Sequence, residues 1–276
     1  ITEDAEFTYD KLVIATGCKT NFFGNSKMQG LTYGMKNTQE TIAIRNNILF
    51  TFEKLIIGKR RSDDGNWNIV IVGSGPTGVE LAGAFAEMKK DILPRDYPNM
   101  NFNDLQIILI SSTEKPLNVM SKEAQEKSEL YLKELGVHFM SGEFVTDYDG
   151  DQVTMKSGKT IKSNNVIWAA GVTGNVIEGL NPEIIIRNRY KTDRFNRVQG
   201  YKNIFAIGDI AYMETPKYPE AHPQVANVAI NQGTNLASNL LKNSENTWEE
   251  YEYKDQGSMA TIGKHRAVVD LPKFKF

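Results

Sequence analysis

Apolar residues gather in short β-branched runs that end in small residues and glycine. Three of these runs are YDKLVIATG (Tyr9–Gly17), VIWAAG (Val166–Gly171) and NIFAIGD (Asn203–Asp209). Short apolar runs bounded by glycine predict buried strands. A strand needs an ending of small residues where a ligand passes close over its backbone. The pattern therefore predicts three strands whose ends face a ligand.

A fourth apolar run is followed at once by a helical pattern, in the segment NIVIVGSGPTGVELAG (Asn68–Gly83). In a strand–turn–helix unit of this kind, Gly73 allows the tight turn, Gly75 lets a pyrophosphate approach, and Gly78 lets the helix pack on the strand. Thr77 lies in the same turn. The phosphates would face the N-terminus of the helix. The unit predicts a dinucleotide-binding domain, with a purely structural turn as the alternative.

The remaining periodicities place further elements around this unit. Helical spacing runs from Asn37 to about Gly58, with Asn37 and Glu40 as a capping pair, and from Ser121 to Leu135 with Gly136 as its stop. The other predicted elements are strands at Leu105–Ile110 and Val137–Met140, a polar linker at Lys59–Gly65, a three-stranded meander with turns at Asp149-Gly150 and Ser157-Gly158 whose last strand leads into VIWAAG, and a helix from His222 to about Leu241. Together they predict an α/β fold.

Composition narrows the class of protein. With 40% apolar and 24% charged residues the 276-residue chain is an ordinary globular protein, and a net charge of −2 gives no case for nucleic acid. Cys18 is the single cysteine, so a redox disulfide is excluded, and we interpret it as a packed small residue. Three scattered histidines suggest no metal site. The chain starts and ends without clear signals, so we expect it to be a piece of a longer protein.

Three candidate residues have competing interpretations. The strand at Leu105–Ile110 ends in Ser111-Ser112, where NAD-binding proteins place the acid that holds the ribose; either Glu114 substitutes for that acid or the serines only begin a turn. Glu80 is either a favourable charge at a helix start or a polar group facing the nicotinamide. His222 is interpreted as a loop residue rather than a catalyst.

Taken in order, YDKLVIATG, VIVGSGPTGVELAG, VIWAAGV, NIFAIGD and HPQVANVAINQG resemble the type II NADH:quinone oxidoreductases. These are single-chain FAD enzymes of the flavoprotein group with two dinucleotide-binding domains. The resemblance extends to the tail GSMATIGKHRAVVDLPKF and so covers nearly the whole chain.

The resemblance implies roles for individual residues. Glu80 would lie by the nicotinamide as the catalytic residue. The implied cofactor-binding residues are Thr16, Gly17, Gly208, Asp209, Val225 and Ala226 for FAD, and Gly73, Gly75, Thr77, Gly78, Ser111 and Gly171 for NADH. The helix from Val225–Ala226 would face the flavin pyrimidine. Asn227 and Asn231 stand where the family usually has glutamines lining the quinone pocket, and their side chains are one methylene shorter.

The implied fold is a Rossmann-like NADH domain with a three-stranded β-meander, inserted in a truncated FAD-binding domain. The expected division is 1–36 and 176–245 for the FAD domain, 37–175 for the NADH domain with its entry helix, and 246–276 for the start of a C-terminal domain. The family's opening FAD unit and its amphipathic membrane region have no counterpart here. We therefore expect the chain itself to be soluble, inactive and poor in FAD.

The implied activity of the parent protein is transfer of a hydride from NADH to FAD and of electrons to a membrane quinone. The parent would be peripheral, on the cytoplasmic side of the inner membrane, and a homodimer is a further expectation. Another pyridine-nucleotide flavoprotein reductase, of the ferredoxin or rubredoxin reductase type, and a non-catalytic NADH-binding module remain the alternatives.

Overall fold

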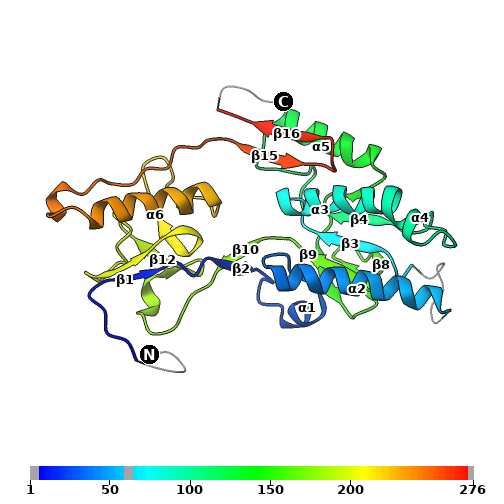
Figure 1. Cartoon of the computed structure of the whole chain (residues 1–276), viewed down its shortest axis with the longest axis horizontal. Coiled ribbons are helices and arrows are strands. Elements are labelled where there is room, and N and C mark those ends of the chain that lie inside the picture. Colours follow the sequence, from blue (N-terminus) through cyan, green and yellow to red (C-terminus); the bar gives the residue numbers. More distant parts are fainter. Residues whose placement is uncertain (1–5, 59–64, 273–276) are drawn as a thin grey trace. The chain divides into compact units, whose positions relative to one another are not determined.

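A computed structural model describes residues 6–58 and 65–272, and the chain divides into two compact units. The first contains the residues up to Lys19 together with Val172–Gln256. The second contains Thr20–Gly171 and the residues from Gly257 on. Figure 1 labels many of the elements of both units.

The second unit is built on a four-stranded parallel sheet. Its strands are β3 (Ile69–Val72), β4 (Ile107–Ile110), β5 (His138–Met140) and β9 (Asn165–Trp168), in the order β5-β4-β3-β9. Every residue of β3, β4 and β9 is buried, as expected for strands that are covered on both faces. In the register, Val72 lies beside Ile110 on one side and Trp168 on the other, so three strand ends are level with one another. This arrangement confirms the predicted Rossmann-like domain.

Helices accompany this sheet. They are α1 (Ser26–Leu31), α2 (Thr38–Ile56), α3 (Pro76–Glu87), a π-helical turn η2 (Met88–Ile92), α4 (Leu93–Asp96) and α5 (Lys122–Glu134). The Asn37 side chain caps α2 by accepting the N–H of Glu40, as predicted. Ser121 caps α5 in the same way. The apolar sides of α2, α3 and α5 and the odd-numbered side chains of β3 and β4 form one hydrophobic core.

Two further sheets belong to the second unit. The meander consists of β6 (Val145–Tyr148), β7 (Gln152–Met155) and β8 (Thr160–Lys162), paired antiparallel. A hairpin of β15 (Ser258–Thr261) and β16 (Ala267–Asp270) packs on α3 and α5, and its Ala260 and Val268 are fully buried in the core of the unit. The tail of the chain is therefore an integral layer of this unit.

The first unit contains shorter elements. Strands β1 (Leu12–Ile14) and β13 (Ile204–Ala206) are parallel neighbours, and β11 (Ile185–Ile186), β12 (Arg189–Thr192) and β14 (Ala211–Met213) form a second sheet. Strand β2 (Cys18–Thr20) pairs with β10 (Val172–Gly174). The helices are α6 (Ala226–Leu240) and the 3-10 turns η3 (Pro182–Ile184), η4 (Gly208–Ile210) and η5 (Glu245–Thr247).

Several predicted boundaries need correction. The strand expected over Tyr9–Gly17 is limited to β1, and its Val13 is 40% exposed, because β13 is its one paired strand within the described residues. The helical pattern expected from His222 begins at Ala226: Pro223 disfavours helical backbone at His222, and Val225 is still extended as the N-cap. VIWAAG belongs to the parallel sheet, and the meander ends at β8. Most of the expected linker, residues 59–64, lies outside the described residues.

Among the helices within residues 6–58 and 65–272, none combines the length and the hydropathy that crossing a bilayer requires.

Candidate functional site

The glycine turn between β3 and α3 is built as the sequence predicts. Gly73 has φ +107°, in the left-handed region, and its N–H donates to the carbonyl of Ile110 at 2.8 Å. A Cβ on Gly73 would lie 2.6 Å from both the carbonyl of Ala169 and the Cα of Ala170. Glycine is therefore required here for its conformation and for the close approach of the end of β9.

Gly78 holds the helix against the strand. A Cβ at this position would lie 1.8 Å from the carbonyl oxygen of Gly73, and it would also touch the side chain of Leu109 at 3.5 Å. Because the neighbouring atom is backbone, it has little freedom to move aside. Gly78 is thus the contact that sets how closely α3 approaches the sheet.

Gly75 is a glycine for a different reason. It is the N-cap of α3 with φ −69° and ψ −178°, a backbone that any residue adopts, and no atom lies within 4 Å of an added Cβ. Pro76 follows as the first helical residue, and no side chain caps the helix. The open space and the uncapped N–H groups, with exposed Thr77 among them, form a cradle that suits a pyrophosphate.

Ser111, the residue in the place of a ribose-binding acid, is turned inward. Its hydroxyl is 2.6 Å from that of Ser74 and 2.8 Å from that of Thr113, and the residue is 3% exposed. Ser111 therefore braces the glycine turn against the end of β4. Ser112 and Glu114 are exposed beside it. The Glu114 carboxylate faces solvent, as the interpretation that Glu114 replaces the ribose-binding acid requires.

The nearest cation to this strand end has a partner. The Lys115 ammonium forms an ion pair with the Glu129 carboxylate of α5. The hydrogen bond and the charge of Glu129 raise the pKa of Lys115 above its ordinary value. The charged Lys115 ammonium is therefore already bound to Glu129 and is not free to bind a phosphate.

Glu80 is exposed in the second turn of α3. Its Oε1 accepts the backbone N–H of Thr261 at 3.3 Å and the Thr261 hydroxyl at 3.4 Å. The hairpin of β15 and β16 thus positions this carboxylate, a contact that the sequence analysis did not find. At the end of β9, Gly171 has φ +133° and is exposed.

In the first unit, the predicted strand ends lie side by side. The parallel register places Ile14 beside Ala206, so Thr16 and Gly17 follow β1 where Gly208 and Asp209 follow β13. Gly17 has φ +65° and no atom within 4 Å of an added Cβ, and its carbonyl accepts the N–H of Asn175. Thr16 is exposed and donates to the carbonyl of Asn175 at 2.7 Å.

Asp209 is held by residues from two other segments. The Cys18 thiol donates to its Oδ2 at 2.9 Å, and the Gln224 amide donates to its backbone carbonyl at 2.9 Å. Cys18 is half-buried and is therefore more than the packed small residue expected: it orients an acid of the candidate site. Sequence alone could not find this pair, since the two residues are 191 positions apart.

The start of α6 carries the other predicted residues. Val225, the N-cap, and Ala226 are exposed, and no side-chain cap covers the helix N-terminus. Asn227 and Asn231 are half-buried and one helical turn apart. Gln232, which the sequence analysis missed, is 1% exposed and accepts the N–H of Gly208 at 2.7 Å, so it joins α6 to the strand end.

His222 precedes α6 and is 3% exposed, deeper than a typical loop residue. Its ring packs against Tyr218, Tyr251 and Tyr253, with centroid distances of 5.1–6.1 Å. Neither ring nitrogen has a hydrogen-bond partner within the part of the chain that the structure describes. Burial lowers the pKa of His222 below its ordinary value. His222 is therefore a buried group whose contacts are aromatic rings.

The predicted residues thus form one group in each unit. The second unit brings together Gly73, Gly75, Thr77, Gly78 and Glu80 on the β3–α3 turn, with Ser111 and Gly171 at the ends of the flanking strands. The first unit brings together Thr16, Gly17, Gly208, Asp209, Val225 and Ala226, with Asn227 and Asn231 further along α6. No cluster of potential metal ligands occurs among the described residues, 6–58 and 65–272.

Comparison with known proteins identifies relatives of both units together. The family model of the pyridine nucleotide-disulphide oxidoreductases matches residues 2–233. The chain is 30% identical, over 97% of its length, to a type II NADH:quinone oxidoreductase of Mycobacterium tuberculosis, and 27% identical over 97% to that of Staphylococcus aureus. These similarities confirm the resemblance predicted from the motifs. The chain spans about 60% of the mycobacterial protein and 67% of the staphylococcal one.

Solved structures share the fold. The structure of NDH2 from Plasmodium falciparum in complex with NADH aligns over 98% of this chain and 71% of that one, with a TM-score of 0.90 at 21% identity. A ferredoxin reductase from Rhodopseudomonas palustris aligns over 96% of this chain and 59% of that one, with a TM-score of 0.67 at 17% identity.

Proposed function

The chain belongs to the pyridine nucleotide-disulphide oxidoreductase family, and on this premise we propose that it is the NADH-binding part of a flavin-dependent NADH:quinone oxidoreductase. The β3–α3 turn is the single observation that carries the proposal. Gly73 and Gly78 are tightly packed, whereas the N-cap at Gly75 is open and leaves room where a pyrophosphate would be held.

In this proposal each part of the second unit has a task. The uncapped N–H groups of α3 bind the phosphates, and Ser111 keeps the turn rigid through Ser74. Glu114 accepts the ribose hydroxyls at the end of β4. Glu80, oriented by Thr261, binds the carboxamide side of the nicotinamide and so fixes which face of the ring is presented.

The residues of the first unit fit the isoalloxazine and ribityl side of an FAD. Gly17 offers an open, left-handed backbone position, and Asp209 offers a carboxylate held in place by Cys18. The uncapped start of α6 presents N–H groups and a positive dipole end, which favour negative charge on the group bound there. When bound, the flavin supplies hydride acceptance and the release of electrons to the acceptor.

The residues proposed for the quinone are Asn227 and Asn231. Both amides lie on one face of α6, half-buried, and have no hydrogen bond among the described residues. They are therefore free to donate to the carbonyl oxygens of a quinone. The proposed enzyme acts at the cytoplasmic surface of a membrane, where quinones are dissolved.

The test is stopped-flow absorbance of the flavin-loaded, full-length parent protein. Anaerobic mixing with NADH is expected to bleach the flavin band, and a short-chain quinone added afterwards is expected to restore it. Bleaching that only a ferredoxin or rubredoxin reverses would favour a reductase of a protein acceptor, the second candidate, which the fold shared with the ferredoxin reductase supports. An unbleached flavin would contradict both.

A further inference from the structure

A cavity of about 440 Å³ lies in the second unit, at the edge of the parallel sheet where β4 begins. The end of α3, the turns η2 and α4, the loop after α4 and the end of α5 border it, together with Ile107, the first residue of β4. Its volume falls within the roughly 300–1,000 Å³ that is usual for small-molecule sites. Side chains from several segments therefore converge on one space.

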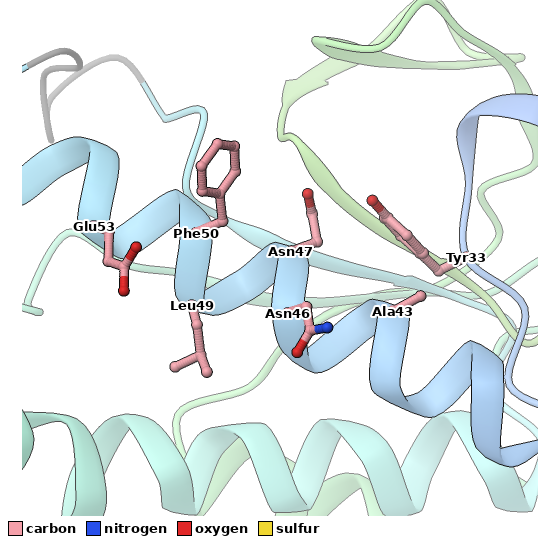
Figure 2. A pocket seen from close by; sticks show the side chains of 7 residues that line it. All are labelled: Tyr33, Ala43, Asn46, Asn47, Leu49, Phe50 and Glu53. Atoms are coloured by element: carbon pink, nitrogen blue, oxygen red, sulfur yellow. The ribbon is translucent and has the colours of Figure 1, made fainter.

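A hollow on α2 lacks this convergence. Six of the seven residues that line it belong to this one helix, and the seventh is Tyr33. Figure 2 shows Leu49 and Phe50 leaving α2 in different directions. Side chains that diverge from one helix do not surround a ligand, so the cavity at β4 is the stronger candidate for a small-molecule site.

The floor of the cavity at β4 is apolar and firmly held. Ala86, Phe102 and Ile107 line it and are 1–6% exposed. The Phe102 ring contacts the rings of Phe52 and Trp67, at centroid distances of 5.8 and 5.9 Å. A ligand with an apolar body would gain free energy by removing this floor and its own surface from water.

Two consecutive lysines, Lys89 and Lys90, also line the cavity. They lie in η2, a π-helical turn in which the N–H of Leu93 donates to the carbonyl of Met88. Consecutive side chains of an α-helix point about 100° apart. Here both lysines border the same space, on the kind of widened turn that is frequent at functional sites.

The charges of these lysines are not neutralised by an ion pair within residues 6–58 and 65–272. The Lys89 ammonium donates to the carbonyl of Leu105, a neutral partner, at 2.6 Å. Burial lowers the pKa of Lys89, and the charge of Asp104 acts in the opposite direction. A half-buried cation of this kind is stabilised by an anion beside it, and the cavity has room for one.

The rest of the rim is polar or open. Asn101 and Asn103 bring side-chain amides to it, and the Asn101 side-chain oxygen accepts the N–H of Asn103 at 3.0 Å. At the end of α5, Gly136 has φ +80°, and no atom lies within 4 Å of an added Cβ. The rim thus offers further donors and free space beside the two lysines.

We propose that this cavity binds a monocarboxylate with an apolar body, of the kind represented by a medium-chain fatty acid. The carboxylate accepts hydrogen bonds from Lys89 and Lys90, and the hydrocarbon body covers Phe102 and Ile107. A phosphate ester fits less well, because its additional oxygens would lie against an apolar floor.

The site is separate from the proposed nucleotide cradle. Ile107 pairs with Ile69 at the start of β3, whereas Gly73 follows the end of that strand, about 13 Å away along it. Ala86 likewise stands near the end of α3, and Gly75 is its N-cap. Both ligands could therefore be bound at the same time.

Titration calorimetry with octanoate tests the chemistry of the site. The folded chain is expected to bind octanoate, and to bind octan-1-ol about tenfold more weakly because the alcohol lacks the charge. Acetate, which lacks the apolar body, should give no measurable binding. Octanoate should bind equally well with NADH present and in the Gly75→Val variant, so a failure of the proposed NADH site would leave this test intact.

Lysine variants test the role of the charges. Lys89→Gln keeps a donor for the Leu105 carbonyl but removes the charge, and it should lower octanoate affinity about tenfold while leaving octan-1-ol affinity unchanged. Lys90→Gln, at an exposed position, should lower octanoate affinity several-fold. Lys127→Gln, exposed on α5 and without an ion pair to the described residues, is the matched control and should change neither affinity. Melting temperatures show that each variant is folded.

Amide chemical shifts locate the ligand. Octanoate should shift the backbone resonances of Asn101, Asn103 and Gly136 and leave those of Gly75 and Thr77 in place. Three results would overturn the proposal: no octanoate binding, equal affinity for octanoate in the wild type and both lysine variants, or displacement of octanoate by NADH with shifts at the β3–α3 turn.

Discussion

The carboxylate of Glu80 accepts two hydrogen bonds from Thr261, a residue 181 positions further along the chain. Glu80 stands on the first helix after the glycine turn, and Thr261 ends the first strand of the tail hairpin. The contact joins the candidate nicotinamide acid to a layer that holds no predicted cofactor residue. It gives Glu80 a fixed position without burying it.

We expect Glu80→Gln to slow flavin reduction by NADH in the flavin-loaded, full-length parent protein while leaving the fold intact. The amide keeps the size of the side chain but loses the charge, and an exposed position should change unfolding free energy by less than about 1 kcal/mol. Stopped-flow bleaching gives the rate and its dependence on NADH concentration.

Glu87→Gln is the matched control for this variant. Glu87 lies on the same face of α3 and accepts the N–H of Lys264 at 2.7 Å, so it makes the same kind of contact with the hairpin loop. The Glu87→Gln variant should leave the rate of flavin reduction unchanged. Equal effects of the two variants would mean that Glu80 only anchors the hairpin.

NADH should bind more tightly than NADPH, and Glu129→Gln should narrow the difference several-fold. The Lys115 ammonium, the nearest cation to the end of β4 in the sequence, is held by Glu129 and is not free to attract a 2′-phosphate. The Glu129→Gln variant releases the Lys115 ammonium and so supplies a cation that can bind the 2′-phosphate of NADPH. Dissociation constants of both nucleotides for the wild type and the variant check this.

Glu123→Gln, on the same helix, is the control, because its carboxylate is exposed and makes no ion pair with the described residues. Preference for NADPH in the wild type would instead mean that Ser112 and Lys115 already form a phosphate site.

The stability of the protein should fall below about pH 6.5 in a way that depends on His222. Burial lowers the pKa of this imidazole, while the charge of Glu252 acts in the opposite direction and Arg189 and Arg194 act with burial. The unfolded chain therefore binds a proton more readily than the folded one. This contribution is fully present above the unfolded pKa of about 6.5 and is lost as pH falls through the lowered folded value.

His222→Phe should remove this part of the pH dependence, since phenylalanine fits an aromatic surrounding and does not titrate. Melting temperatures between pH 5 and 8 measure it, and exposed His265→Gln serves as the control. An unchanged slope in His222→Phe would show that the imidazole is already protonated or solvated in the folded state.

Much of the fold could be predicted because local patterns carry it. The glycine motif of the β3–α3 turn and the Asn37 cap depend on residues within five positions of one another. The meander followed from its two turns. Boundaries were less certain: α6 begins at Ala226 rather than at His222, and Val13 is exposed although its run reads as buried. The start of a helix depends on local backbone conformation, and the burial of a strand depends on which strands pair with it. Hydrophobic periodicity reports neither.

The candidate site was predictable where it lies on glycines and strand ends, and hidden where distant segments meet. The inward turn of Ser111 depends on Ser74, 37 positions away, and the orientation of Asp209 depends on Cys18. The packing of His222 among three tyrosines has no local signal at all. Each is a tertiary contact between residue types that are common in any loop.

Titration calorimetry of NADH into the folded chain and its Gly75→Val variant tests the central claim most directly. Gly75 has an ordinary backbone conformation and open space around it, so valine should leave the melting temperature nearly unchanged while filling the place of the pyrophosphate. Gly30→Val, at another glycine with open surroundings, is the matched control. We predict that the wild type and Gly30→Val bind NADH and that Gly75→Val, equally folded, does not. Equal binding by all three, or by none, would contradict the assignment of the β3–α3 turn as the NADH site.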